Sequence, residues 1–117
     1  MKYLMLLLFA GMAIQEKKVY KEYNGGREGF SYSYLVLYNN HTYYYSERYD
    51  FPGTLKDEGE WQIKSDKVIL TSNKRNKDYG NKKVFKGNAF KLSNNEVIIQ
   101  MGSGKDKHTV VLQEKSR

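Results

Sequence analysis

Tyrosine is the residue type whose number and spacing point most directly to recognition chemistry in this chain. The sequence contains 11 tyrosines, and seven of them fall between Tyr32 and Tyr49. A tyrosine ring presents an apolar face together with a hydroxyl that donates or accepts a hydrogen bond. Contiguous exposed aromatic surface often marks an interaction site. We therefore take Tyr32, Tyr34, Tyr38 and Tyr44 as a candidate ligand- or partner-binding surface.

A purely structural role for the same tyrosines stays open. Tyrosine suits β-strands, and cross-strand aromatic pairs stabilise a hairpin by up to about 1 kcal/mol each. The outer face could also be covered by residues 16–23 or by another subunit. In either case the tyrosines would support the fold and bind nothing.

Lysine and arginine supply a second candidate surface. They outnumber Asp and Glu by 20 to 13, and between residues 67 and 91 eight basic residues face one acid, Asp78. Such a cluster could bind lipid headgroups, an acidic polysaccharide or nucleic acid. It could equally be a solvated loop that keeps the protein soluble, since only one of the eight is arginine, which bidentate phosphate recognition favours. The candidate anion-contact residues are Lys74, Arg75, Lys77, Lys82 and Lys83.

Residues suited to catalysis or metal binding are few. Asp57, Glu58 and Glu60 could pair as carboxylates for glycoside hydrolysis, although Glu58 and Glu60 share a strand face that we expect to be exposed. His41 and His108 lie in polar, turn-like sequence without ligand spacing. We therefore expect no enzyme activity, no cofactor and no metal, and keep a small secreted hydrolase as the less favoured alternative.

The first residues predict export. Lys2 is followed by an apolar stretch and then by Gly11 and Ala13, which form a small-x-small pair. This is the layout of a secretory signal peptide, and it is shorter than the roughly 20 residues of a membrane-spanning helix. We expect cleavage after residue 13, or as late as residue 15, and no transmembrane segment in the mature chain.

The remainder, residues 14–117, is long enough for one domain. It contains no cysteine, which favours a bacterial periplasmic or extracellular protein over a disulfide-stapled eukaryotic one.

Nearly every stretch after residue 16 alternates with the two-residue period of a β-strand. The expected strands are residues 16–23, 30–38, 42–49, 59–64, 67–71, 83–86, 89–92, 97–101 and 109–113. Connections this short pair sequential neighbours, so we predict an all-β, antiparallel up-and-down meander that forms a lipocalin-like small barrel of about eight strands. A β-sandwich is the alternative.

Strand parity also predicts which side chains fill the core. The expected inward residues are Leu35, Leu37, Tyr43, Tyr45, Trp61, Ile63, Val68, Leu70, Phe85, Phe90, Leu92, Val97, Ile99, Met101, Val110 and Leu112. Val84 could face inward in place of Phe85. So many large side chains favour a filled interior over a ligand cavity.

Residues 35–71 resemble a recurring pattern of small bacterial envelope domains. The pattern reads LVLYNNHTYYY, then GEWQI, then KVILT, with Val68 where isoleucine is usual. It is similar to the lipocalin-like half-barrels of NlpE-type lipoproteins and related secreted proteins of the Bacteroidota. The resemblance implies that Thr42 and Tyr43 close the hairpin and that Gly59 and Trp61 seal the barrel floor. The C-x-x-C motif and lipidated cysteine of the NlpE-type proteins are absent, so copper handling and lipid anchoring do not carry over.

These observations favour non-catalytic binding of a small molecule, a glycan or a protein by a monomer or weak dimer. The alternative is a structural or accessory envelope protein that acts through protein–protein contact. Nucleic acid is not an expected partner of an exported chain.

Overall fold

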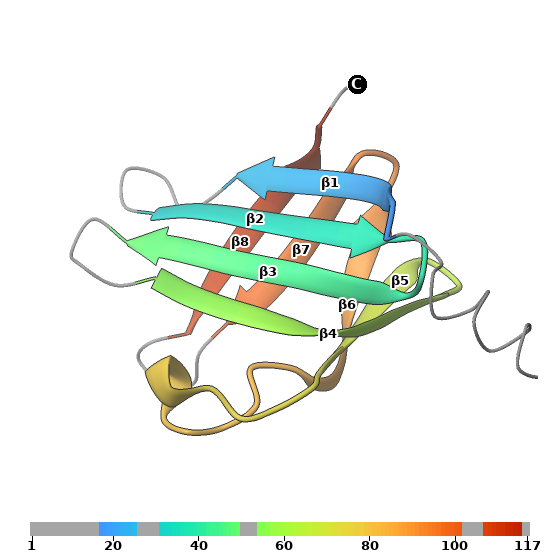
Figure 1. Ribbon diagram of the computed structural model, residues 1–117. Coiled ribbons are helices and arrows are strands. Elements are labelled where there is room, and N and C mark those ends of the chain that lie inside the picture. The colour runs from blue at the N-terminus through green and yellow to red at the C-terminus, as the bar shows by residue number, and fades with distance from the viewer. Residues whose placement is uncertain (1–16, 26–30, 50–53, 102–106, 116–117) are drawn as a thin grey trace, which may run out of the picture.

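The protein is a closed barrel of eight antiparallel strands in which each strand pairs with the next along the chain (Figure 1). The computed structural model describes residues 17–25, 31–49, 54–101 and 107–115. The expected signal segment, residues 1–13, lies outside them. Pairing of β1 with β8, through Tyr23 opposite Glu114 and Gly25 opposite Leu112, closes the sheet on itself. The predicted up-and-down barrel is therefore confirmed, and the β-sandwich alternative is wrong.

The elements follow one another with short connections. They are β1 (Val19–Gly25), β2 (Ser31–Tyr38), β3 (Thr42–Tyr49), β4 (Thr54–Lys64), β5 (Lys67–Ser72), the 3-10 turn η1 (Lys77–Tyr79), β6 (Lys86–Ser93), β7 (Glu96–Met101) and β8 (His108–Glu114). The predicted turn at residues 39–41 is present, with His41 in a left-handed conformation at φ 68°.

The largest departures from the predicted strand boundaries are in β4, at residues 83–86 and in β6. β4 begins at Thr54, five residues earlier than expected, and this places Leu55 and Asp57 on its buried face. Residues 83–86 do not form a strand of their own, because Val84 and Phe85 are both buried and so lack the alternation of a strand. Gly87 and Asn88, expected as a break, lie inside β6.

Aromatic side chains fill the centre of the barrel. The ring of Phe85 packs edge-on against those of Tyr45 and Phe90 at 5.4 Å and of Tyr43 at 6.1 Å between centroids. These contacts leave the interior filled by the protein's own side chains, as small eight-stranded barrels allow.

Most of the predicted inward residues are buried. Ile63 is the exception: it lies next to the last residue of β4 and is 42% exposed, although its cross-strand partner Val68 is fully buried. Leu92 is only partly buried against the core. Tyr23 and Leu55 belong to the core but were not expected there.

Trp61 closes one end of the barrel. Its ring stacks on Tyr20 at 5.4 Å and lies 4.9 Å from His41, and its indole nitrogen donates a hydrogen bond of 2.8 Å to the carbonyl oxygen of Tyr38. Gly59, on the same inward face, admits no side chain, since a Cβ there would collide with the backbone carbonyl of Thr71 and the ring of Tyr43.

Trp61→Ala is expected to destabilise the fold by about 3–5 kcal/mol, because it removes a large buried ring and leaves a cavity. Trp61→Phe should cost less, since an aromatic ring stays; it loses the smaller volume difference between indole and phenyl and the indole hydrogen bond, which is worth about 0.5–1.5 kcal/mol. Urea unfolding followed by circular dichroism measures both. Equal stability of the alanine variant and the wild type would contradict the placement of Trp61 as the floor of the barrel.

Candidate functional site

The outer face of β2, β3 and β4 carries three cross-strand rows of side chains. The register places Tyr32, Arg48 and Thr54 in one row, Tyr34, Ser46 and Lys56 in the next, and Val36, Tyr44 and Glu58 in the third. Adjacent side chains in such rows are close enough to contact one another.

Ser46 makes this face hollow. Its short side chain lies at the centre of the grid, with Tyr34 and Lys56 across the sheet and Tyr44 and Arg48 along its own strand. The longer side chains around it form the rim of a groove of about 440 Å³. The tyrosine groove, as we call it, is lined by Tyr32, Tyr34, Tyr44, Ser46, Arg48, Thr54 and Lys56.

The tyrosines of this face differ in how their side chains are constrained. The hydroxyl of Tyr34 donates a hydrogen bond of 3.0 Å to the carboxylate of Glu22 on β1. Burial, this hydrogen bond and the charge of Glu22 raise the pKa of Tyr34 to about 12. Val36, an outward residue between Glu22 on β1 and Tyr44 on β3, is only 2% exposed. Tyr32, by contrast, is 52% exposed and free to contact a ligand.

The segment between β5 and β6, residues 73–85, docks along the edge of β4. We call it the basic loop. The amide of Asn73 donates to the carbonyl of Glu58 at 2.9 Å, and the side chain of Asn76 donates to the carbonyl of Lys56 at 2.5 Å. These hydrogen bonds lie just beyond the last β4–β5 pair, Gly59 with Ser72, so the loop continues alongside β4 where β5 ends.

The docked loop forms a second groove beside the first. This loop groove has a volume of about 500 Å³ and is lined by Tyr44, Lys56, Asp57, Glu58, Lys74, Arg75, Asn76, Lys77 and Asp78. Tyr44 and Lys56 line both grooves. The tyrosine surface and the basic loop, which the sequence suggests as separate candidates, are therefore parts of one continuous surface.

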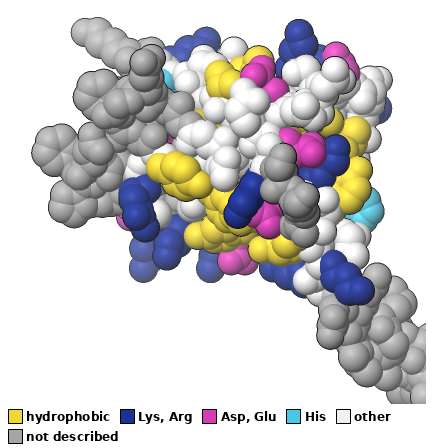
Figure 2. All heavy atoms as spheres, turned by 90° about the horizontal axis from the view of Figure 1, so that it is seen from above, with side chains coloured by type: hydrophobic (Ala, Val, Ile, Leu, Met, Phe, Trp, Pro, Cys, Tyr) yellow, Lys and Arg dark blue, Asp and Glu magenta, His cyan; other side chains and the backbone are white. Residues whose placement is uncertain are grey.

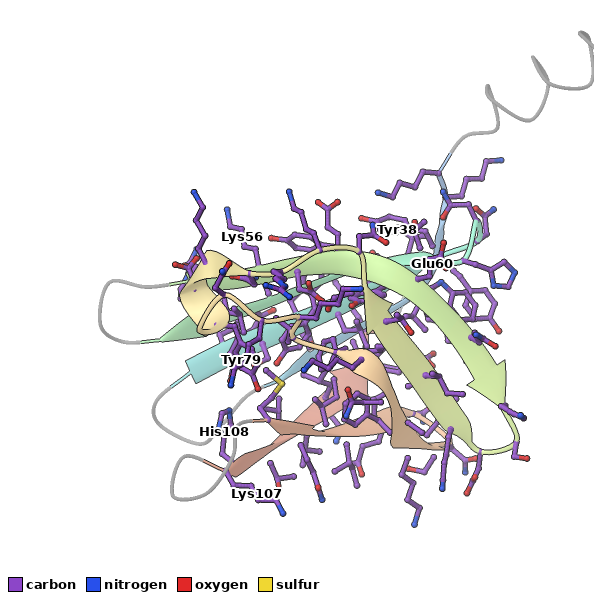
Figure 3. All side chains as sticks on the ribbon, turned by 90° about the horizontal axis from the view of Figure 1, so that it is seen from below. Tyr38, Lys56, Glu60, Tyr79, Lys107 and His108 are labelled. Atoms are coloured by element: carbon purple, nitrogen blue, oxygen red, sulfur yellow. The ribbon has the colours of Figure 1, made fainter. Side chains whose placement is uncertain are left out.

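The side of the barrel that carries Lys56 can be followed in Figure 3, and the composition of the surface seen from above in Figure 2. Tyr38, Lys56 and Glu60 lie along the same side of the barrel in Figure 3, with η1 next to Lys56. Figure 2 shows hydrophobic side chains, a class that includes tyrosine there, interspersed with basic and acidic ones on the surface seen from above. The exterior of the barrel is therefore chemically mixed.

The structure groups some of the predicted site residues and separates others. Tyr32, Tyr34 and Tyr44 share the tyrosine groove, whereas Tyr38 lies beyond Val36, with the ammonium of Lys17 4.3 Å from its ring centre. Lys74, Arg75 and Lys77 line the loop groove. Lys82 and Lys83 lie in a separate hollow that Arg75 also borders.

Four groove residues were missed by reasoning from sequence, namely Ser46, Arg48, Thr54 and Lys56. The signal for Arg48 was present, because it shares the outward parity of Tyr44 on the expected strand 42–49. Lys56 and Thr54 could not be assigned a face, because they precede the expected start of the strand at residue 59.

A buried polar network lies on the inner face behind these grooves. The carboxylate of Asp57, 4% exposed, accepts hydrogen bonds from the hydroxyls of Tyr43 at 2.6 Å and Ser72 at 2.7 Å. The hydroxyl of Ser72 in turn accepts from the amide of Phe85 at 2.9 Å. Burial raises the pKa of Asp57, and the two hydroxyl donors partly offset this effect. The network joins β3, β4 and β5 to the end of the basic loop.

A second buried carboxylate occurs nearer the other end of β3. Glu47 is fully buried and its Oε1 lies 3.0 Å from Nε2 of His108. Among the described residues, its Oε2 and the hydroxyl of Ser33 on the adjacent strand have no hydrogen-bond partner. Because Ser33 and Glu47 are directly opposite each other, these two atoms mark one polar position inside the barrel.

The other residues considered for chemistry do not come together. Glu58 borders the loop groove while Glu60, also exposed, lies outside both grooves, so the two carboxylates do not converge in a cleft. His41 packs on Trp61, and His108 pairs with Glu47 instead. No group of three or more His, Cys, Asp or Glu residues suited to a metal ion occurs within the described ranges.

Comparison with known proteins gives no relative. No family model, curated protein or solved structure matches the chain. In the part of the chain that the structure describes, no helix is long and apolar enough to cross a bilayer.

Asp57→Asn is expected to change how stability depends on pH. The pKa of Asp57 in the unfolded chain is about 4, and burial raises it in the fold, so the native state binds this proton more tightly. The contribution of Asp57 is therefore most favourable below pH 4 and declines as the pH rises through the native pKa.

The free energy of unfolding of the wild type minus that of Asp57→Asn should accordingly fall as the pH is raised from about 4 to 7. Urea unfolding of both proteins at several pH values gives this difference. A difference that rises with pH would show that the hydrogen bonds to the carboxylate outweigh the cost of its burial.

Proposed function

We propose that this protein is an exported, non-catalytic binding domain that holds an acidic glycan across the tyrosine groove and the loop groove. The observation that carries the proposal is that Tyr44 and Lys56 line both grooves. A ligand extended over this boundary meets aromatic rings on one side and, on the other, the basic side chains of Lys74, Arg75 and Lys77, with the acids Glu58 and Asp78 among them.

The chemistry of the lining suits a sugar chain with acidic groups. Exposed tyrosine rings can pack against the apolar faces of pyranose rings, and Ser46 and Thr54 offer hydroxyls at the floor. Arg48 and Arg75 can bind carboxylate or sulfate in a bidentate manner, while Lys56, Lys74 and Lys77 supply point charges.

Two other kinds of ligand are less well supported. A small molecule inside the barrel would have to displace the packed rings of Tyr43, Tyr45, Phe85 and Phe90. Nucleic acid also binds surfaces of aromatic and basic residues. Export, which residues 1–13 predict, would place the protein among acidic envelope or extracellular glycans and away from nucleic acid.

The proposal is tested by calorimetric titration with hexagalacturonate, which carries carboxylates, and with cellohexaose, a neutral β-linked control. We expect binding of the acidic oligosaccharide only, with an affinity that falls as salt is added, because exposed charges are screened. Tighter binding of a single-stranded oligonucleotide, or equal binding of the neutral glycan, would overturn the proposal.

A blocking substitution tests the location of the site. Ser46→Tyr fills the hollow of the tyrosine groove with a residue that strands tolerate well, and it should reduce affinity by about tenfold or more. The matched control is Thr109→Tyr, which adds the same ring to an exposed position on β8.

Single substitutions then separate the aromatic and ionic contributions. Tyr32→Ala should weaken binding while Tyr32→Phe, which keeps the ring, should not. Arg48→Ala should cost about 1.5–3 kcal/mol of binding free energy if its guanidinium bonds an acidic group. If neither Ser46→Tyr nor Arg48→Ala changes the affinity, the ligand does not lie in the tyrosine groove.

A further inference from the structure

Strands β6 and β7 separate over part of their length. Within the described residues they pair only through Lys91 with Ile98, Leu92 with Val97 and Ser93 with Glu96. β6 nevertheless begins at Lys86, and β7 continues to Met101 in full pairing with β8. The gap is a groove of about 620 Å³, the β6–β7 split, lined by Lys67, Asn88, Ala89, Phe90, Lys91, Ile98, Gln100 and Lys107.

The split has strand edges on both sides. The amide of Leu92 donates to the carbonyl of Asp66, on the β5 side, at 2.7 Å. Because the hydrogen-bonding direction alternates along an antiparallel strand, the N–H and C=O of Lys91 and Ala89 point the other way, toward β7. By the same alternation, Gln100, two residues after Ile98, directs its main-chain N–H and C=O toward β6. Lys91 with Ile98 is the last β6–β7 pair toward this end within the described residues, so Ala89 and Gln100 are not paired with each other and both edges can accept another strand.

The positive charges around the split favour an acidic ligand. Lys67 and Lys91 lie directly opposite each other on the outer face of β5 and β6, and like charges in that position are destabilising. Lys107 borders the same groove from the start of the β8 segment. Between the lysines, Ile98 and Ala89 give an apolar floor for alternate side chains of an extended segment.

We infer that the β6–β7 split binds an extended acidic peptide segment of a partner protein by strand addition. Free main-chain groups supply the affinity of such a complex, and flanking pockets and charges select the sequence. The formal charge of +7 opposes occupation by a second copy of this chain.

This inference does not depend on the glycan surface. Lys107 and Lys56 lie on opposite sides of the barrel in Figure 3, so the two surfaces can be occupied and tested independently.

The test is titration of the full protein with a capped hexapeptide of alternating glutamate and valine. One control peptide carries N-methyl groups on alternate amides, which removes main-chain donors and keeps the charges. We expect the N-methylated peptide to bind about tenfold or more weakly, as the loss of about one net hydrogen bond or more implies. Equal binding of the two peptides would overturn strand addition.

Variants of the protein test strand addition by removing a main-chain donor from β6 instead of from the peptide. Ala89→Pro removes an N–H that bonds no strand and is tolerated at an edge, so it should abolish binding of the acidic peptide with the fold retained by circular dichroism. Ala89→Ser is the matched control and should bind normally. If Ala89→Pro does not fold, the comparison of the N-methylated and unmodified peptides is the test of strand addition.

A charge exchange tests the choice of partner. Lys107→Glu should weaken binding of the glutamate peptide and improve binding of a lysine–valine peptide, whereas Lys18→Glu, at an exposed position just before β1, should do neither. Unchanged preference in Lys107→Glu would overturn the assignment of an acidic segment. So would a stable dimer in light scattering that Ala89→Pro disperses, since it would make a second copy the occupant.

Discussion

The insertion of Phe85 into the barrel is the interaction on which the rest of the structure depends. Phe85 belongs to the loop between β5 and β6, yet its ring meets Tyr43, Tyr45 and Phe90 at the centre of the core. Its amide donates to Ser72, whose own amide donates to the carbonyl of Phe85. One residue thus fills the interior and fixes the end of the basic loop. The interior is thereby filled with the protein's own rings, and the basic loop lines a groove that shares Tyr44 and Lys56 with the tyrosine groove.

The hollow on the outer face has an equally simple origin. Alternation along β2, β3 and β4 brings Tyr34, Tyr44, Arg48 and Lys56 around one small residue, Ser46. Long side chains around a short one leave a depression without any distortion of the backbone. The binding surface that we propose is therefore a consequence of register, and a slip of one residue in β3 would turn its side chains to the other face.

The barrel could be predicted from the sequence because the patterns that indicate strands and turns are local. Two-residue alternation and short turns identified most strands, and parity then identified most of the core, including Trp61 and the rings at Tyr43 and Tyr45. The prediction failed where tertiary contacts override the local pattern. Val84 and Phe85 are buried together because a loop enters the core. Ile63 has the inward parity of Trp61 and a buried cross-strand partner in Val68, yet it is exposed at the end of β4.

The candidate site was only partly visible in the sequence for a related reason. The tyrosines and lysines are conspicuous by composition, but their adjacency depends on bonds between residues far apart in the chain, such as Asn76 to the carbonyl of Lys56. Ser46 has no signal of its own, since a serine on a strand becomes important only when its four neighbours are known. The resemblance to NlpE-type envelope domains remains a prediction.

The central claim, that the ligand lies on the outer face over Ser46 and not inside the barrel, is tested most directly by amide chemical-shift mapping during titration with hexagalacturonate. The account predicts that shifts concentrate at Tyr32, Tyr34, Tyr44, Ser46, Arg48, Lys56 and the basic loop. Shifts confined to inward positions such as Leu35, Tyr45 and Leu112 would contradict it and would return the ligand to the interior.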